Sequence, residues 1–387
     1  MAINILIDDV TDKIDKTTKF IIFPYFQLGC GYINLKTLLD KFPDRFKEIG
    51  VFNLPIFSVP FLNNNEIFFN STIAHEIGHF IVDNTEVLQV EESNITQNIL
   101  ENPKIKEKII IKMQKIMDEN SDLDKNLECL RLKGVVTKKY FEKIKQWIKE
   151  ILSDLIGIKI FGLPFLFGFI KTINHSEAEY GSSQHPPPWL RFNYLYKEYE
   201  NNFMKKIKNF EFENNKNNAK MNFGNMIQED LKILKDYFNK VKNGHPPIVY
   251  EIELELIEKS VNFKKLISDI LKKNSNLELL SYDYDRKNKT EIMKLLKKLL
   301  NYITPNEIID IKKEKTYPAA YRNILNAGWF FYLYLINNHY ELLNFKEHNL
   351  SNRPEVNQRL NNLILKAIEL SNIHKISKSK LEKIIKT

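Results

Sequence analysis

The sequence predicts a mainly α-helical protein with a small β element near its N-terminus. From residue 103 onward, apolar residues recur at three- and four-residue spacing, the period of a helix with one buried face. Before that point, residues 20–26 and 51–61 are apolar runs typical of extended chain. Hydrophobic residues make up 43% of the 387 residues and aromatic residues 12%, which is ample for a large core. We therefore expect a globular protein with a helical C-terminal lobe.

The elements are expected in the following order. Residues 20–26 predict a strand, and residues 51–61 predict an extended segment that its two prolines confine to a sheet edge or an irregular lead-in. Helical spacing is found in residues 67–81, 105–117, 140–160, 189–210, 226–241, 253–271, 291–302, 321–338 and 358–373. Residues 155–170 are strongly apolar, but they are fewer than the ~20 that cross a bilayer and contain Lys159 and Pro164. A buried helix broken near Gly162 is the better interpretation, and membrane association is not favoured.

The length of the chain supports two domains. We expect residues 1–200 to form one domain and residues 201–387 to form a second, helical domain with an accessory or regulatory role. The polar segment 214–218 is the best candidate for a linker, and a surface loop within one domain is the alternative.

The number and distribution of charged residues bear on whether the protein binds nucleic acid. The net charge is +8, from 57 basic and 49 acidic residues, but the basic residues are spread along the chain and arginine is scarce. Nucleic-acid binding as a main function is therefore not favoured.

Cys30 and Cys129 cannot form a disulfide framework and are expected to be buried thiols. The first residues contain acids where a signal peptide needs a basic and then an apolar stretch, so a cytoplasmic location is expected. The oligomeric state is not indicated.

The most informative motif is His75-Glu76-Ile77-Gly78-His79. On a helix, His75 and His79 stand one turn apart on one face, which lets two imidazoles hold one zinc ion, and Glu76 is a candidate general base. Uncharged or apolar neighbours fit a helix buried under a metal site. The alternative is an ordinary amphipathic helix with capped or solvated histidines.

A catalytic zinc ion usually has three protein ligands, so a third ligand is expected on another helix. Glu150 and Asp154 are four residues apart on an otherwise apolar helical face. Buried carboxylates are costly unless they are paired or bind a metal. We expect Glu150 to be the ligand and Asp154 to orient a ligand imidazole. The alternative is a solvated helix edge in which both carboxylates pair with Lys149 or Lys159.

These two motifs resemble the zinc site of the thermolysin-like gluzincins, in which a Glu-x-x-x-Asp helix follows the His-Glu-x-x-His helix. The resemblance covers the two short helices, and the connection between them is much longer here than in thermolysin. It implies a zincin-like catalytic lobe, a Zn²⁺ cofactor and peptide-bond hydrolysis.

A second cluster supplies candidates for stabilising an oxyanion. His185 precedes three consecutive prolines that fix an extended segment, and Arg191 follows in the first turn of the next helix. Either side chain, or that of Tyr180, would suit the developing charge of a tetrahedral intermediate. The alternative is a structural proline-rich turn at a helix start.

Together these motifs predict a zinc-dependent metallopeptidase acting on a protein or peptide substrate. Glu76 would take a proton from the metal-bound water, and residues 56–59 would bind an extended substrate as an added strand. The alternative is a helical interaction or regulatory protein with a structural or catalytically idle zinc site. A peptidase controlled by its helical lobe would combine the two.

Overall fold

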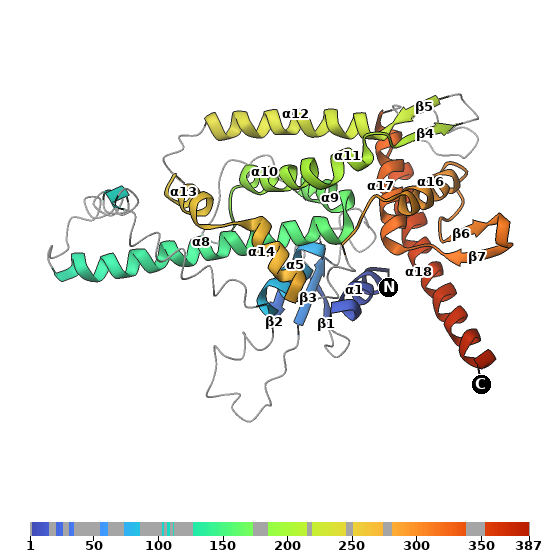
Figure 1. Cartoon of the computed structure of the whole chain (residues 1–387), viewed down its shortest axis with the longest axis horizontal. Coiled ribbons are helices and arrows are strands. Elements are labelled where there is room, and N and C mark those ends of the chain that lie inside the picture. Colours follow the sequence, from blue (N-terminus) through green and yellow to red (C-terminus); the bar gives the residue numbers. More distant parts are fainter. Residues whose placement is uncertain are drawn as a thin grey trace.

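The computed structural model describes residues 2–14, 21–25, 31–34, 55–60, 73–85, 103, 107–108, 111, 127–172, 185–214, 219–244, 251–273, 281–337 and 353–386. Over these residues the protein is mainly helical with few short strands, as the apolar spacing predicts (Figure 1). The expectations for Cys30 and for helix at residues 67–72 lie outside the described residues, as do most residues of the helix predicted at 105–117 and the side chain of Cys129.

The long helix α8 (Leu127–Phe161) is the central element of the fold (Figure 1). Its 35 residues correspond to a length of roughly 50 Å at 1.5 Å per residue. Apolar side chains on its C-terminal half are fully buried, including Ile144, Trp147 and Ile151. Five of the helices packed against α8 are α5 (Ile73–Asn84), α9 (Leu163–Thr172), α10 (Pro188–Glu198), α13 (Glu251–Ser260) and α14 (Phe263–Lys273).

Three short strands form a sheet in the order β1-β3-β2, with β1 at Ile21–Tyr25, β2 at Gly31–Asn34 and β3 at Pro55–Pro60. β3 pairs in parallel with β1 and antiparallel with β2, so it is the central strand. The prediction of an edge strand was therefore wrong. Proline is tolerated here because it occupies the two ends of β3, which leaves the N–H groups of residues 56–59 available for pairing. β1 pairs with residues 56–60 and β2 with residues 55–58, so residues 56–58 have no free side to which a peptide could add.

The predicted break near Gly162 is confirmed. α8 ends at Phe161, Gly162 adopts a φ of +70°, and α9 begins at Leu163. A positive φ suits glycine, and a Cβ at this position would lie 2.8 Å from the hydroxyl of Tyr284. That hydroxyl accepts a hydrogen bond from the backbone N–H of Leu163, so the corner is fixed by a distant part of the chain. No helix among the described residues is both long and apolar enough to cross a membrane.

The chain after α10 continues as a helical path through a π-helical turn, η1 (Tyr199–Phe203), and α11 (Met204–Ile207). The helix predicted over residues 189–210 is thus divided, and it ends earlier than expected. Asn214 then pairs with Ala219, because β4 (Glu211–Asn214) and β5 (Ala219–Asn222) form an antiparallel hairpin. Residues 214–218 connect two paired strands, which contradicts their interpretation as a linker between domains. Residues 200 and 201 both lie within η1, and the division of the chain there stays a prediction.

The C-terminal half contains most of the predicted helices. One predicted helix, over residues 253–271, is split into α13 and α14 at Val261 and Asn262. The remaining elements are α12 (Phe223–Gly244), α16 (Arg286–Leu300), β6 (Glu307–Asp310), η3 (Ile311–Lys313), β7 (Lys315–Pro318), α17 (Tyr321–Asn337) and α18 (Arg353–Lys386). The N-terminal helix α1 (Ala2–Ile14) packs against α18, and Asp9 forms an ion pair with Lys375.

Candidate metal centre

The candidate centre forms where α5 and α8 pack closely together. Gly78, on α5, makes this approach possible. A Cβ added there would lie 2.6 Å from the carbonyl oxygen of Ser153 and 2.7 Å from its Cα. No side chain fits at that distance, so glycine is needed where the two backbones touch. Glycine inside a helix lowers stability by roughly 1 kcal/mol relative to alanine. A glycine within a predicted helix therefore indicated, from the sequence alone, that another backbone approaches there.

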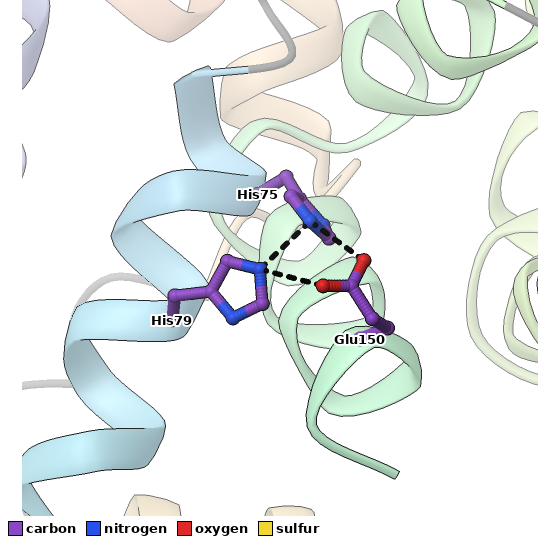
Figure 2. A group of neighbouring side chains, drawn as sticks. All are labelled: His75, His79 and Glu150. Carbon is purple, nitrogen blue, oxygen red and sulfur yellow. Dashed lines mark hydrogen bonds and ion pairs between the residues drawn. The ribbon is translucent and has the colours of Figure 1, made fainter. Parts of the chain in front are cut away.

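Three side chains from these two helices converge on one point (Figure 2). Nε2 of His75 lies 3.0 Å from Nε2 of His79. The carboxylate of Glu150 faces both rings, with Oε2 3.3 Å from Nε2 of His75 and Oε1 3.2 Å from Nε2 of His79. One potential ligand atom from each residue falls within a group no wider than 4.8 Å. The three ligands predicted from two separate motifs are thus close enough to hold one metal ion.

The opposite nitrogen of each ring is held by a neighbour on α8. Nδ1 of His75 lies 2.8 Å from Oδ1 of Asp154, as predicted for a carboxylate that orients a ligand histidine. Nδ1 of His79 lies 3.0 Å from the hydroxyl of Ser153, a contact that the sequence interpretation missed. The available signal was a serine one residue before Asp154 on a buried stretch, where an unpaired hydroxyl would be costly. Both contacts direct Nε2 toward the centre.

Asp154 is fully buried and held mainly by Arg191. Nε of Arg191 donates to Oδ2 of Asp154 and Nη2 donates to Oδ1, each at 2.7 Å. Burial alone would raise the pKa of Asp154, but the Arg191 guanidinium and His75 hold that pKa below its usual range. Bidentate pairs of this kind fix orientation as well as charge.

The alternative of a solvated helix edge is wrong, because the nearby lysines have other partners. Lys149 pairs with Asp83 at 2.8 Å, and Lys159 pairs with Glu198 at 2.7 Å. Both carboxylates of the motif face inward, with Glu150 at 6% and Asp154 at 0% relative exposure.

Burial and charge act in opposite directions on the pKa values of His75 and Glu150, and in the same direction on that of His79. Burial by itself would lower the pKa of His75, but the carboxylates of Asp154 and Glu150 outweigh it and raise that pKa to about 10. Burial and the neighbouring charge on His75 lower the pKa of His79. Burial would raise the pKa of Glu150, whereas His75 and His185 hold it well below its usual range. Without a metal, His75 therefore stays protonated, and its positive charge lies between the carboxylates of Glu150 and Asp154.

These residues fit a metal ion. A tetrahedral zinc ion with bonds of ~2.0–2.1 Å separates its ligand atoms by roughly 3.3–3.4 Å, close to the three spacings found here. Although Nδ1 of His185 lies 3.0 Å from Oε2 of Glu150, this buried oxygen accepts no hydrogen bond of good angle from any described residue. Two imidazole nitrogens and an under-satisfied carboxylate oxygen facing one another call for a shared cation. The donor set does not by itself identify the metal.

The other predicted site residues are placed as follows. Glu76 is buried at 9% relative exposure on α5, and its charge acts on both His79 and Arg191. His185 lies at the rim of the centre with 57% of its side chain exposed. Arg191 lies beside Asp154 with 16% of its side chain exposed, and its Nη1 is 3.6 Å from Oε2 of Glu150. Tyr180 lies outside the described residues, so its predicted role is untested.

Comparison with known proteins adds no family to this picture. No family model, curated protein or solved structure matches the chain. The gluzincin resemblance is therefore supported by the His75-His79-Glu150 cluster alone, and the zincin-like arrangement of the N-terminal lobe stays a prediction.

Proposed function

We propose that this protein is a zinc-dependent metallopeptidase whose metal is held by His75, His79 and Glu150. The observation that carries the proposal is the convergence of three donor atoms from α5 and α8, with a carboxylate, Glu76, next to the first ligand in the chain. Two imidazoles and one carboxylate are a donor set that zinc accepts in hydrolases. When bound, zinc would polarise a carbonyl and lower the pKa of its bound water.

Within this proposal, Glu76 is the general base. A carboxylate can accept the proton of the attacking water and pass it to the leaving amine, and burial keeps Glu76 away from competing bulk water. His185, exposed at the rim and 3.0 Å from the Glu150 carboxylate, is the side chain best placed to meet the developing oxyanion.

Arg191 receives a different role from the one that the sequence suggests. Its Nε and Nη2 already donate to Asp154, and its guanidinium lies 5.0 Å from the centre of the Phe169 ring. We therefore assign it to positioning: Arg191 holds Asp154, and Asp154 holds the ring of His75. This chain of contacts fixes the direction of Nε2 before any substrate arrives.

A peptide is the proposed substrate because an edge strand lies beside the metal-binding helix. Among the described strands, β2 pairs on one side only, with β3, and it contacts α5. An extended peptide could add to the other side of β2 through backbone hydrogen bonds. This replaces the predicted addition to residues 56–59, which β1 covers on one side and β2 covers as far as Ser58 on the other.

The test is Glu76→Gln, assayed on a fluorogenic peptide library with bound zinc measured in parallel. We expect hydrolysis to be lost and the zinc content to stay at one ion per chain, since Glu76 is not a ligand. Glu229→Gln on α12 is the matched control, because it removes the same charge from an exposed position. Wild-type hydrolysis by Glu76→Gln would overturn the mechanism, and a wild-type protein that binds no zinc would overturn the proposal.

A structural metal site in a helical interaction or regulatory protein is the second candidate, and the position of His185 favours it. Structural zinc sites are closed by four protein ligands, and among the described residues His185 is the additional imidazole nearest to Glu150. The variant His185→Ala separates the candidates. A catalytic site keeps its metal and loses turnover, whereas a site closed by His185 loses metal affinity and stability together.

A further inference from the structure

A second candidate site lies away from the metal centre, in a cleft of about 1020 Å³. Its walls are α16, the β6–β7 hairpin and the first turn of α17, and residues of α1 and α18 complete it. These elements lie together on the side of the molecule opposite α13 (Figure 1). None of the lining residues belongs to α5 or α8, so the cleft is separate from the site proposed for hydrolysis.

Cationic side chains dominate the lining of this cleft. One face of α16 presents Arg286, Lys287 and Lys294 to the cleft. Thr290 lies on the same face, three or four residues from each of them along the helix. Lys313, Arg322 and Lys375 come from three other elements, and the described lining contains two carboxylates, Asp9 and Glu291. Positive charge from four separate elements is thus gathered around one volume, which the spread of lysines along the sequence did not reveal.

The two lining carboxylates, together with Asp310 beside Lys313, leave part of this charge unbalanced. Nζ of Lys313 lies 4.0 Å from Oδ2 of Asp310. Asp9 pairs with Lys375 at 3.3 Å. An oxygen of Glu291 accepts the backbone N–H of Ala320 at 2.8 Å, so this carboxylate holds the start of α17. Within the described part of the chain, neither Arg286 nor Lys287 pairs with a carboxylate, and the Lys294 ammonium donates to the backbone carbonyl of Ile309.

The interior of the cleft combines Arg322 with apolar and aromatic groups. The Arg322 guanidinium is half-buried, donates to the carbonyl of Ile160 at 3.3 Å and lies over the ring of Tyr282. Burial lowers the pKa of Arg322 although the charge of Asp9 acts in the opposite direction, so an added anion would favour the charged guanidinium further. Tyr317 and the buried Tyr321 add ring surface to the wall.

We propose that this cleft binds a phosphorylated small molecule that carries two or more phosphate charges. Several ammonium groups and two guanidinium groups around one volume match phosphate oxygens, to which arginine can donate two hydrogen bonds at once. The volume is that of a site for a small ligand. A nucleic-acid surface would instead spread its cations along a stripe that follows a backbone.

The test measures binding of inorganic triphosphate to the full chain by titration calorimetry, in EDTA so that a bound metal contributes nothing. We expect saturable one-to-one binding at about 0.15 M salt, where long-range attraction is largely screened. Arg286→Glu/Lys294→Glu should weaken binding at least tenfold. Lys232→Glu/Lys240→Glu on α12 is the matched control: it reverses two exposed charges outside the cleft and should change affinity less than twofold.

Three results would overturn the proposal. The first is no saturable binding up to ~1 mM triphosphate, which corresponds to less than ~4 kcal/mol of binding free energy. The second is an equal loss of affinity in the two charge-reversal variants, which would indicate attraction to net charge only. The third is tighter binding of an oligoglutamate peptide or a short DNA duplex than of triphosphate, with the same dependence on Arg286 and Lys294, because the partner would then be a macromolecule. All of the substituted lysines and Arg286 are exposed, so loss of folding is not expected.

Discussion

Replacing Gly78 with alanine tests whether contact between α5 and α8 sets the metal ligands in place. The new Cβ would lie 2.6 Å from the carbonyl oxygen of Ser153, whereas ordinary contact begins near 3.4 Å. Relieving the clash requires the helices to separate by ~0.8 Å, since neither backbone can deform cheaply. If this shift reaches the ligands, the spacings of 3.2 and 3.3 Å between Glu150 and the two imidazoles approach ~4 Å, beyond the tetrahedral value of roughly 3.3 Å.

Stability and metal affinity should both fall. Alanine is favoured over glycine in a helix by roughly 1 kcal/mol, but overpacking costs ~1–3 kcal/mol, so we expect a net loss of up to ~2 kcal/mol. Removing a residue that supports a metal ligand typically lowers metal affinity ~10–100-fold. Displacing the ligand itself should lower metal affinity by at least that factor. Competition with a chromophoric chelator measures the affinity, and denaturant unfolding of the metal-free protein measures the stability.

Gly157→Ala is the matched control. Its Cβ would lie 2.7 Å from the Phe165 side chain, so it crowds the packing of α8 against α9 and leaves the contact with α5 unchanged. We expect it to lower stability while keeping wild-type metal affinity. Wild-type metal affinity in Gly78→Ala, or an equal loss of affinity in Gly157→Ala, would refute the assignment of Gly78 as the spacer of the centre.

Three further predictions concern the groups around the ligands. Asp154→Asn removes the carboxylate that accepts two hydrogen bonds from Arg191, leaving Glu150 at 3.6 Å as the nearest carboxylate in the site, and should destabilise the fold by ~3 kcal/mol in denaturant unfolding; a loss below ~1 kcal/mol would contradict the pairing. Ser153→Ala removes the contact to Nδ1 of His79 and should weaken metal binding by roughly tenfold in chelator competition, whereas unchanged affinity would show that the hydroxyl does not orient the ring. Because the folded-state pKa of His75 is raised from 6.5 to about 10, its proton stabilises the metal-free fold fully below pH 6.5, and this stabilisation is lost as pH rises toward 10. Metal must displace that proton, so affinity should increase with pH across this window and calorimetry in two buffers at pH 7 should detect proton release; an affinity independent of pH would count against a ligand role for His75.

The sequence was most informative where a pattern is contained within one helix. The one-turn separation of His75 and His79 is fixed by helical geometry, so their shared face could be predicted before the fold was known. The shared face of Glu150 and Asp154 could be predicted for the same reason. Two carboxylates on a buried helical face need a partner, which indicated a site there. Most of the helices were found from apolar spacing alone, although the π-helical turn at Tyr199–Phe203 left no signal that we recognised.

The sequence was least informative about partners. The hydrogen bonds between Arg191 and Asp154 were not foreseen, and the role of Arg191 at an oxyanion stays a prediction. β3 was expected at a sheet edge, because nothing in its own residues shows that two other strands flank it. The basic cleft was invisible, since its cations are contributed by elements from α16 to α18 that are separated along the chain.

The sequence by itself thus determined the helical class, the two motifs that carry the candidate ligands, and donor types that suit a metal. The tertiary structure decided that these donors meet, that Ser153 and Asp154 orient the rings, and that Arg191 supports them. The physical reason is the range of each constraint. Helical periodicity is set by neighbours within a turn or two, whereas the position of Glu150 opposite His75 and His79 depends on how two distant helices dock, and the contact at Gly78 fixes that docking.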